Sequence, residues 1–454
     1  MLFLIKTLHQ MKLKNNIIGS WFIIIAIFSL FLGLVFGILG GLQHLYPNLL
    51  KDTLSFQKMR PLHTYLSINW IFTAATGIIY YYLPEVSGRK IYSEKLAKLQ
   101  IALQILILVL VTVFFVLGKF GGREYLEFPP YIVILIVSSW LIFMYNFFMT
   151  VKPNYKTVPV YIWSWSTGLI FFLITTIEAQ LWQLSFFNDN IIRDVTIQWK
   201  AMGSMVGSWN MLVYGTAMFA MEKISGDQKI NQSKIAFFFY FLGLTNLMFN
   251  WGHHTYIVPA SPIVKLIAYS ISMTELLILA NIIYSFRKTY LKANHQNHKL
   301  SFKILTYAEI WILLNLVLSI SISIPAINFY THGTHITVAH AMGSTIGINT
   351  LLLLASITLI VDDVAPHFLN WKRYNWSLLV FNLSLVIFWV CLVGMGLQKI
   401  SEKLQNKSFY DMINALSIYF KIFTSSGAVL LLALIALLYP LLKFSWQSVT
   451  KKIQ

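Results

Sequence analysis

Apolar segments of about 20 residues recur along the whole sequence, and this repetition limits the fold more than any other feature. About 20 residues of α-helix span roughly 30 Å, the thickness of the hydrocarbon core of a bilayer. Lipid offers no hydrogen-bond partners, so the backbone of such segments satisfies its own polar groups as helix. Twelve segments qualify: 17–43, 62–84, 99–118, 130–151, 159–184, 198–221, 235–257, 262–286, 304–325, 336–361, 377–397 and 419–442. We therefore predict an all-α, polytopic membrane bundle of about twelve transmembrane helices, with residues 1–454 in one domain.

The charge of the chain is small in amount and basic in balance. Only 11% of the residues are charged, and 34 Lys and Arg against 16 Asp and Glu give a formal net charge of +18. With the N-terminus inside, 22 of these 34 basic residues fall on the inner side of the twelve segments and 12 on the outer side. Basic residues concentrate on the cytoplasmic side of membrane proteins. The pattern predicts a multi-pass membrane protein with both termini cytoplasmic. The basic side chains are expected to meet lipid headgroups, not nucleic acid.

Cysteine chemistry is nearly absent from the chain. The single cysteine, Cys391, lies inside an apolar segment. One cysteine excludes an intrachain disulfide, a CxxC redox pair and a CxxCH haem attachment on this chain. If the protein uses electrons, a partner has to deliver them.

Histidines occur where apolar segments begin or end. The run Tyr330-Thr-His-Gly-Thr-His-Ile-Thr-Val-Ala-His340-Ala-Met342 opens the tenth segment. Residues two apart on an α-helix point about 200° from each other. His340 and Met342 would therefore face opposite sides of one helix, and each could hold a different iron. The simpler alternative is that both side chains only pack.

Two further histidine sites support the metal interpretation. His63 opens the second segment, and the adjacent pair His253 and His254 closes the seventh. With the predicted topology, both sites and His340 lie in the outer third of the membrane. Adjacent histidines are about 100° apart on a regular helix, so one metal would need an irregular turn, for which Gly252 and Thr255 are suited.

Ionisable side chains within apolar segments are costly in lipid and are candidates for function. Four are found here: Glu178, Lys200, Glu275 and Glu309. Glu275 is the deepest relative to the ends of its segment and could relay protons. The alternative is a neutral carboxylic acid that is hydrogen-bonded inside the bundle.

The chain resembles the catalytic subunit of the haem-copper oxidase superfamily, and it is most similar to the nitric oxide reductase large subunit and the C-family oxygen reductases. Four runs carry the resemblance: Arg60-Pro-Leu-His63, Gly122-Arg-Glu-Tyr-Leu-Glu127, Gly252-His-His254 and Tyr330-Thr-His-Gly-Thr-His335 with Thr337-Val-Ala-His340. It implies two haems, low-spin and high-spin and of b-type, a non-haem iron or copper, and calcium. The implied ligands are His63 for the low-spin haem, His340 for the high-spin haem, His253 with His254 for the non-haem metal, and Glu124 for calcium, with Arg60 as a cofactor contact.

Two positions depart from the family pattern. The second ligand expected on segment ten is a histidine, but this chain has Met342, which could still complete a low-spin haem with His63. The third histidine of the non-haem metal is expected on segment six, where our alignment places Asn210, a weak oxygen ligand that disfavours copper. Tyr214 follows one turn later, at the position of a glutamate in nitric oxide reductases and of a tyrosine in oxygen reductases.

The resemblance implies a respiratory oxidoreductase that reduces NO to N2O with electrons from a small membrane-anchored c-type cytochrome subunit on the periplasmic side. Three alternatives remain open. Tyr214 favours reduction of O2 to water, Asn210 favours an NO dismutase-like reaction, and the weakened metal site favours a catalytically silent haem-binding protein. The predicted catalytic residues are Tyr214, Asn210 and Glu275.

Overall fold

The computed structural model describes residues 2–290 and 298–450. Within these residues the fold is entirely helical, as predicted. The long helices are α1 (Leu2–Leu45), α2 (Phe56–Ser87), α3 (Glu94–Val116), α4 (Ile132–Val151), α5 (Val160–Glu178), α7 (Ile191–Ser225), α8 (Lys234–Phe249), α9 (Pro262–Tyr290), α10 (Lys299–Ser323), α13 (Leu351–Val364), α14 (Trp371–Leu404) and α16 (Ser417–Val449). The short ones are η1 (Leu181–Gln183), α6 (Ser185–Asn188), η2 (Ile230–Gln232), η3 (Asn250–Thr255), α11 (Pro325–Thr331), α12 (His335–Met342), η4 (Gly343–Thr350) and α15 (Phe409–Ala415).

Each of the twelve predicted segments overlaps a helix, and α12, η4 and α13 together form the tenth. Nine helices of the described residues are long and apolar enough to cross a membrane. The predicted segments outside that set are those of α2, α7 and α9. A helix whose side chains pack on other helices needs less apolar surface, because it meets little lipid. The membrane bundle is thus established by nine spans, and the total of twelve remains a prediction.

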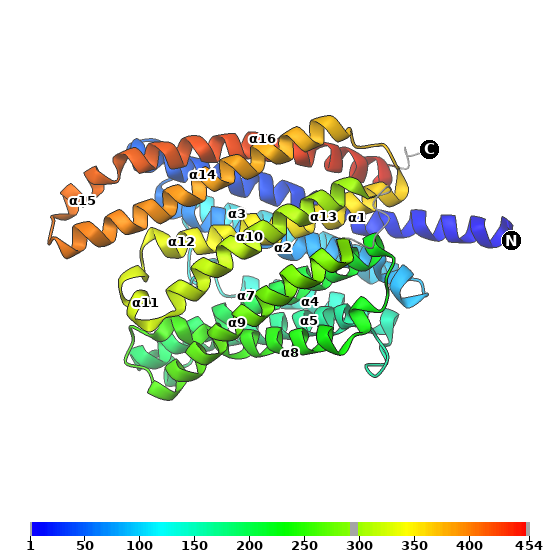
Figure 1. Ribbon diagram of the computed structural model, residues 1–454, viewed down its shortest axis with the longest axis horizontal. Helices are drawn as coiled ribbons and strands as arrows, with labels where there is room; N and C mark the ends of the chain where they lie inside the picture. Colours follow the sequence, from blue (N-terminus) through cyan, green and yellow to red (C-terminus); the bar gives the residue numbers. More distant parts are fainter. Residues whose placement is uncertain (1, 291–297, 451–454) are drawn as a thin grey trace.

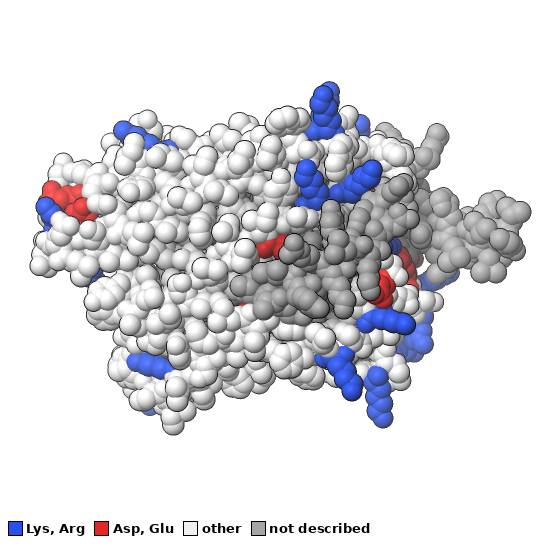
Figure 2. All heavy atoms as spheres, viewed as in Figure 1, with Lys and Arg blue, Asp and Glu red and all other residues white. Residues whose placement is uncertain are grey.

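The helices run side by side along the long axis of the molecule, and α1 begins at the end of the bundle where α16 finishes (Figure 1). Figure 2 shows Lys, Arg, Asp and Glu side chains gathered mostly toward the two ends of this face, with a broad uncharged surface between them. Polar ends on either side of an apolar belt are what a bilayer requires. The surface agrees with a membrane protein.

The centre of the bundle contains α2 and the continuous tenth segment. The most apolar window of His335–Val364 is 89% buried, against 22% for α3. Two hydrogen bonds join these helices, Trp70 Nε1 to Thr350 Oγ1 at 3.1 Å and the Tyr82 hydroxyl to Asp363 Oδ2 at 3.3 Å. The two bonds are 12 residues apart on α2 and 13 apart on the partner, so the two helices run parallel and in register.

Side-chain caps fix where several helices begin. The Ser93 hydroxyl accepts from the backbone N–H of Leu96 at the start of α3, and the Asn190 side chain accepts from two backbone N–H groups at the start of α7. Such caps satisfy donors that have no partner within the helix. Cys391 is buried in α14 and free, in line with its isolation in the sequence.

Candidate metal and haem centre

The adjacent histidines lie on a short 3₁₀ turn. After α8 ends, η3 tightens the chain over Asn250–Thr255. Thr255 stabilises the turn because its hydroxyl donates to the Gly252 carbonyl at 2.7 Å. The rings of His253 and His254 then lie 4.2 Å apart, centroid to centroid, with their planes tilted by 43°. The irregular turn that the sequence required is therefore present.

Two histidines from a distant part of the chain lie within electrostatic range of this pair. His340, on α12, and His332, just before α12, both act electrostatically on His253 and on His254. The Nδ1 atom of His340 is buried and makes no hydrogen bond of good geometry among the described residues, although the backbone of Asn315 on α10 lies near enough to interact with the ring. Burial lowers the pKa of His332 below its ordinary value, which favours a neutral ring that can accept a hydrogen bond or bind a metal. The structure thus brings together the histidines predicted for the high-spin haem and the non-haem metal.

Helix α7 contributes the opposite wall of this site, and its register can be read from its neighbours. The ring of Trp199 stacks on His254 at 4.5 Å with planes 9° apart. Further along, a Cβ added to Gly203 would meet Trp251, and one added to Gly207 would meet Leu247. These pairs show that α7 runs antiparallel to α8 and η3. Each step of four residues forward along α7 meets a residue three or four positions earlier in η3 and α8.

This register corrects the predicted position of the third ligand. Asn210 lies 11 residues beyond Trp199, about 16 Å along the helix axis. The structure therefore does not bring Asn210 to the level of His253 and His254. At about that height α7 carries the amide of Gln198, whose Nε2 is buried and has no hydrogen-bond partner among the described residues. Our alignment was displaced because α7 contains no histidine to anchor it.

The correction also affects Tyr214. One turn after Gln198 the chain has Met202, which is buried, so neither a glutamate nor a tyrosine follows the ligand position. Tyr214 is near Glu275 instead, since the two groups interact electrostatically. Glu275 itself accepts hydrogen bonds from Asn250 Nδ2 at 2.7 Å and from the Ser319 hydroxyl at 3.2 Å. The buried carboxyl is therefore held close to the η3 turn, as a proton-relay residue would need.

The donor set suits a metal only in part. Among the described residues, no group of three or more His, Cys, Asp or Glu side chains is arranged to hold a metal ion. The half-buried pair of imidazoles on η3 and the half-buried ring of His340 nevertheless fit a haem beside a second metal, because they lie close together and close to a further ring, His332.

The predicted low-spin site lies on the parallel pair of α2 and the tenth segment. His63 Nδ1 is 2.7 Å from the Gly33 carbonyl of α1, which fixes one ring nitrogen and leaves Nε2 for a ligand. Trp70 of α2 is hydrogen-bonded to Thr350 of the tenth segment. Seven residues earlier on both helices, His63 therefore lies level with position 343, which is next to Met342. Met342 is half-buried against the main core. The two predicted ligands therefore lie at one depth on neighbouring helices.

The loop between α3 and α4 carries the predicted calcium ligand. Glu124 is exposed at the tip of a turn, whereas Glu127 forms an ion pair with Arg60 of α2. Burial raises the pKa of Glu127, and the adjacent Arg60 partly offsets this. Arg123 binds Asp194 at 2.8 Å and so ties the loop to α7. The structure joins Arg60 to Glu127, and calcium at Glu124 and a haem contact at Arg60 remain predictions.

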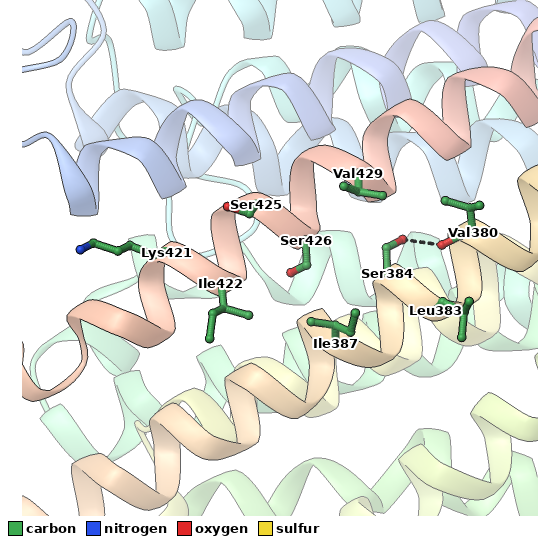
Figure 3. Close-up of a pocket in the computed structure, with 9 residues that line it drawn as sticks. All are labelled: Val380, Leu383, Ser384, Ile387, Lys421, Ile422, Ser425, Ser426 and Val429. Carbon is green, nitrogen blue, oxygen red and sulfur yellow. Dashed lines mark hydrogen bonds between the residues drawn. The ribbon is translucent and has the colours of Figure 1, made fainter.

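The remaining ionisable candidates behave differently. Glu178 of α5 and Lys200 of α7 form an ion pair, so their charges compensate each other. Glu309 is half-buried on α10. A groove of about 480 Å³ between α14 and α16 (Figure 3) involves none of the predicted ligands; its lining consists of Val380, Leu383, Ser384, Ile387, Lys421, Ile422, Ser425, Ser426 and Val429.

Sequence reasoning missed two residues of this site, Asn250 and His332, and it did not single out Gln198. Asn250 directly precedes the Trp-Gly-His-His run, and His332 lies in the histidine run of segment ten. Both could have been found in the sequence, because each stands close to a predicted ligand. Gln198 carried no such signal. An amide in an apolar helix marks a polar site, but it does not by itself indicate a metal.

Comparison with known proteins agrees with the geometry. The family model for cytochrome c and quinol oxidase polypeptide I matches residues 17–430. A nitric oxide reductase subunit of Stutzerimonas stutzeri is 25% identical over 467 aligned residues, covering 95% of this chain and 95% of that protein. A solved structure described as a heme-copper terminal oxidase dimer superposes with a TM-score of 0.71 at 12% identity, covering 95% of this chain and 84% of that one. The chain therefore belongs to the cytochrome c and quinol oxidase polypeptide I family, and is a subunit I of the haem-copper oxidase superfamily, whose members are oxidoreductases that bind haems and a non-haem metal.

Proposed function

We propose that this chain is the membrane subunit of a nitric oxide reductase-like enzyme, with the reaction 2 NO + 2 e⁻ + 2 H⁺ → N2O + H2O. The observation that carries the proposal is the convergence of His340 with His253 and His254, in a chain that aligns almost end to end with a subunit of a nitric oxide reductase. The convergence of histidines by itself does not distinguish NO from O2 as substrate. The preference for NO rests on the reductase relative, which aligns over 95% of the chain, whereas the solved terminal oxidase shares the fold at 12% identity and the family model covers the superfamily as a whole.

Each histidine has a separate role in this proposal. His340 would hold the high-spin haem, His63 with Met342 the low-spin haem, and His253 with His254 the non-haem metal, iron in preference to copper. When bound, these groups supply the electrons and the sites at which NO is bound and reduced. Gln198 would contribute an amide oxygen at the third position of the non-haem metal. Hard oxygen donors favour iron over copper, which is why iron is preferred here.

Glu275 would deliver protons to this pocket. Its carboxyl is one hydrogen bond from Asn250, which in turn contacts His253. A carboxyl group held at this distance can pass a proton toward the substrate pocket without entering the metal's ligand set. Tyr214 interacts electrostatically with the same carboxyl, so it is the next protonatable group along this route.

A partner subunit would supply the electrons. The reductase relative is by its name one part of a larger complex, and this chain has no site for a covalently attached haem. We propose a small membrane-anchored c-type cytochrome on the periplasmic side, with calcium at Glu124 and the haem edge near Arg60 at the contact. The protein would lie in the bacterial inner membrane with its haems toward the periplasm.

Reduction of O2 is the second candidate function. The similarity to a terminal oxidase fold keeps it open, although Tyr214, which favoured it in the sequence, is not at the metal level. NO dismutation loses the residue that favoured it, because Asn210 lies about 16 Å from the histidine level along α7. A catalytically silent haem protein is the outcome if the two-histidine site holds no metal.

The test is turnover by the purified complex with an artificial electron donor, measured separately with NO and with O2. We expect NO consumption with N2O as product, and we expect the variant His340→Ala to abolish it together with the high-spin haem spectrum. O2 consumption without NO consumption would replace the proposal with the second candidate. If a protein that contains both haems consumes neither NO nor O2, the chain is a catalytically silent haem-binding protein.

A further inference from the structure

We infer that Asn250 is a positioning residue that fixes the ring of His253 for metal binding and connects it to Glu275. The inference rests on the proposed non-haem metal centre, of which His253 is a ligand. It concerns a residue that the family pattern did not lead us to expect. The structure links three groups through one amide: an imidazole, a hydroxyl and a carboxyl.

The amide of Asn250 is fully engaged by these neighbours. Its Oδ1 lies 3.0 Å from His253 Nδ1, whose ring also interacts with the Asn250 backbone, and it accepts from the Ser272 hydroxyl. Its Nδ2 donates to Glu275 Oε1 at 2.7 Å. Since the nitrogen of the amide faces the carboxyl, the oxygen must face the imidazole and the hydroxyl. The two assignments support each other.

This orientation determines the tautomer of His253. An amide oxygen can only accept, so the hydrogen bond requires a proton on Nδ1 of the ring. The other nitrogen, Nε2, then carries the free electron pair and is the atom available to a metal. Histidine ligands generally donate their second ring N–H to a fixed acceptor, and loss of that acceptor typically weakens metal binding about 10- to 100-fold.

The amide is itself held in place from another helix. Ser272 and Glu275 both belong to α9, one turn apart, while Asn250 begins η3. A carboxyl and a hydroxyl on the same face of α9 thereby orient a ligand on the preceding segment. Glu275 is also held by Ser319 of α10, so three helices converge on one imidazole.

Asn250 could instead serve only to end α8, since asparagine is common at such positions. Its backbone N–H does bond to the Asn246 carbonyl in that role. The side chain, however, makes no bond to the helix end and points to His253 and Glu275. A purely structural role would change stability and leave the metal's ligand set intact, so the two roles can be separated by experiment.

The experiment titrates the purified complex with ferrous iron in a chelator buffer and counts imidazole ligands by X-ray absorption. We expect Asn250→Ala to weaken iron affinity about 10- to 100-fold and to lower the imidazole count by one. Asn250→Asp keeps an acceptor for the His253 ring and should restore the affinity to within a few-fold of the parent protein. The matched control is Asn246→Ala, one turn earlier, which removes hydrogen bonds to Leu242 and Thr274 and should leave the affinity unchanged.

The outcomes distinguish this inference from the proposed function. If the parent protein binds no iron outside its haems, the proposed metal centre fails and this inference fails with it. If the parent binds iron and Asn250→Ala binds it equally well with the same imidazole count, the positioning role alone is wrong. The same holds if Asn250→Asp is as weak as Asn250→Ala while both unfold at the temperature of the parent.

Discussion

At the scale of single residues, the proposed site differs from the family pattern in two amide side chains. One takes the place of a ligand, and the other lies next to a ligand. In the proposed centre Gln198 takes the third position of the non-haem metal, and Asn250 lies beside His253. An amide oxygen is a weaker ligand than an imidazole for late first-row metals. The site as folded is therefore expected to bind its metal less tightly than a three-histidine site would.

The position of the third ligand leads to a direct prediction. Gln198→His should create a third imidazole at the level of the pair and tighten iron affinity by at least about tenfold, which corresponds to about 1.4 kcal/mol. Asn210→His is the matched control, because it adds the same ring about 16 Å farther along α7 and should have no effect. Chelator-buffered iron titrations measure both. If Asn210→His tightened iron binding and Gln198→His did not, the sequence alignment would be right and the register derived from the structure would be wrong.

At the scale of elements, glycines allow α7 to approach α8 and η3 closely. A Cβ at Gly207 would lie 2.7–2.8 Å from atoms of Leu247, including its Cα. The Ser204 hydroxyl donates to the Leu247 carbonyl at 3.0 Å beside it. Small residues at a helix interface are how membrane helices gain close packing. This contact sets the height of Gln198 and Trp199 relative to the histidines.

Gly207→Ala should therefore destabilise the bundle, because the backbone of Leu247 cannot move aside as a flexible side chain would. Overpacking of this kind costs about 1–3 kcal/mol. We expect a lower apparent melting temperature of the detergent-solubilised protein and weaker iron binding. Gly427→Ala is the control, since the nearest atom to its added Cβ would be in Phe388 at 3.6 Å, an ordinary contact. Equal melting temperatures for the two variants would show that the α7 contact is not tight.

At the scale of the whole molecule, charge and packing divide the bundle into a polar end, an apolar belt and a second polar end. The first and last helices, α1 and α16, begin and finish at the same end (Figure 1), which an even number of crossings produces. The tenth segment, which carries His340 and Met342, is 89% buried in its most apolar window, whereas Lys234–Thr255, which carries His253 and His254, is 17% buried. The proposed centre is therefore enclosed by the bundle on the side of the tenth segment.

The topology is tested by reporters fused to the C-terminus. With both termini cytoplasmic, a green fluorescent protein fusion should fluoresce and an alkaline phosphatase fusion should be inactive, because each reporter folds on one side of the membrane. Fusions in the loop that contains Glu124 should give the reverse pattern. Phosphatase activity at the C-terminus would exclude twelve spans with a cytoplasmic N-terminus.

Local patterns were sufficient to predict the membrane bundle and the family, and they singled out the histidines of the proposed site. These patterns are about 20 apolar residues in a row, adjacent histidines before a polar turn, and motifs within a single segment. The irregular turn at His253 and His254 could also be inferred, because a regular helix separates neighbouring side chains by about 100°.

Packing between helices was needed to show which residues of other segments meet those histidines. Position along α7 depends on glycine contacts with Trp251 and Leu247, and position along α2 depends on a hydrogen bond from Trp70 to Thr350. Such contacts join residues far apart in the chain, so no local pattern in α7 distinguishes Gln198 from Asn210. For the same reason the link from Glu275 through Asn250 to His253 became visible only when α9 was packed against η3.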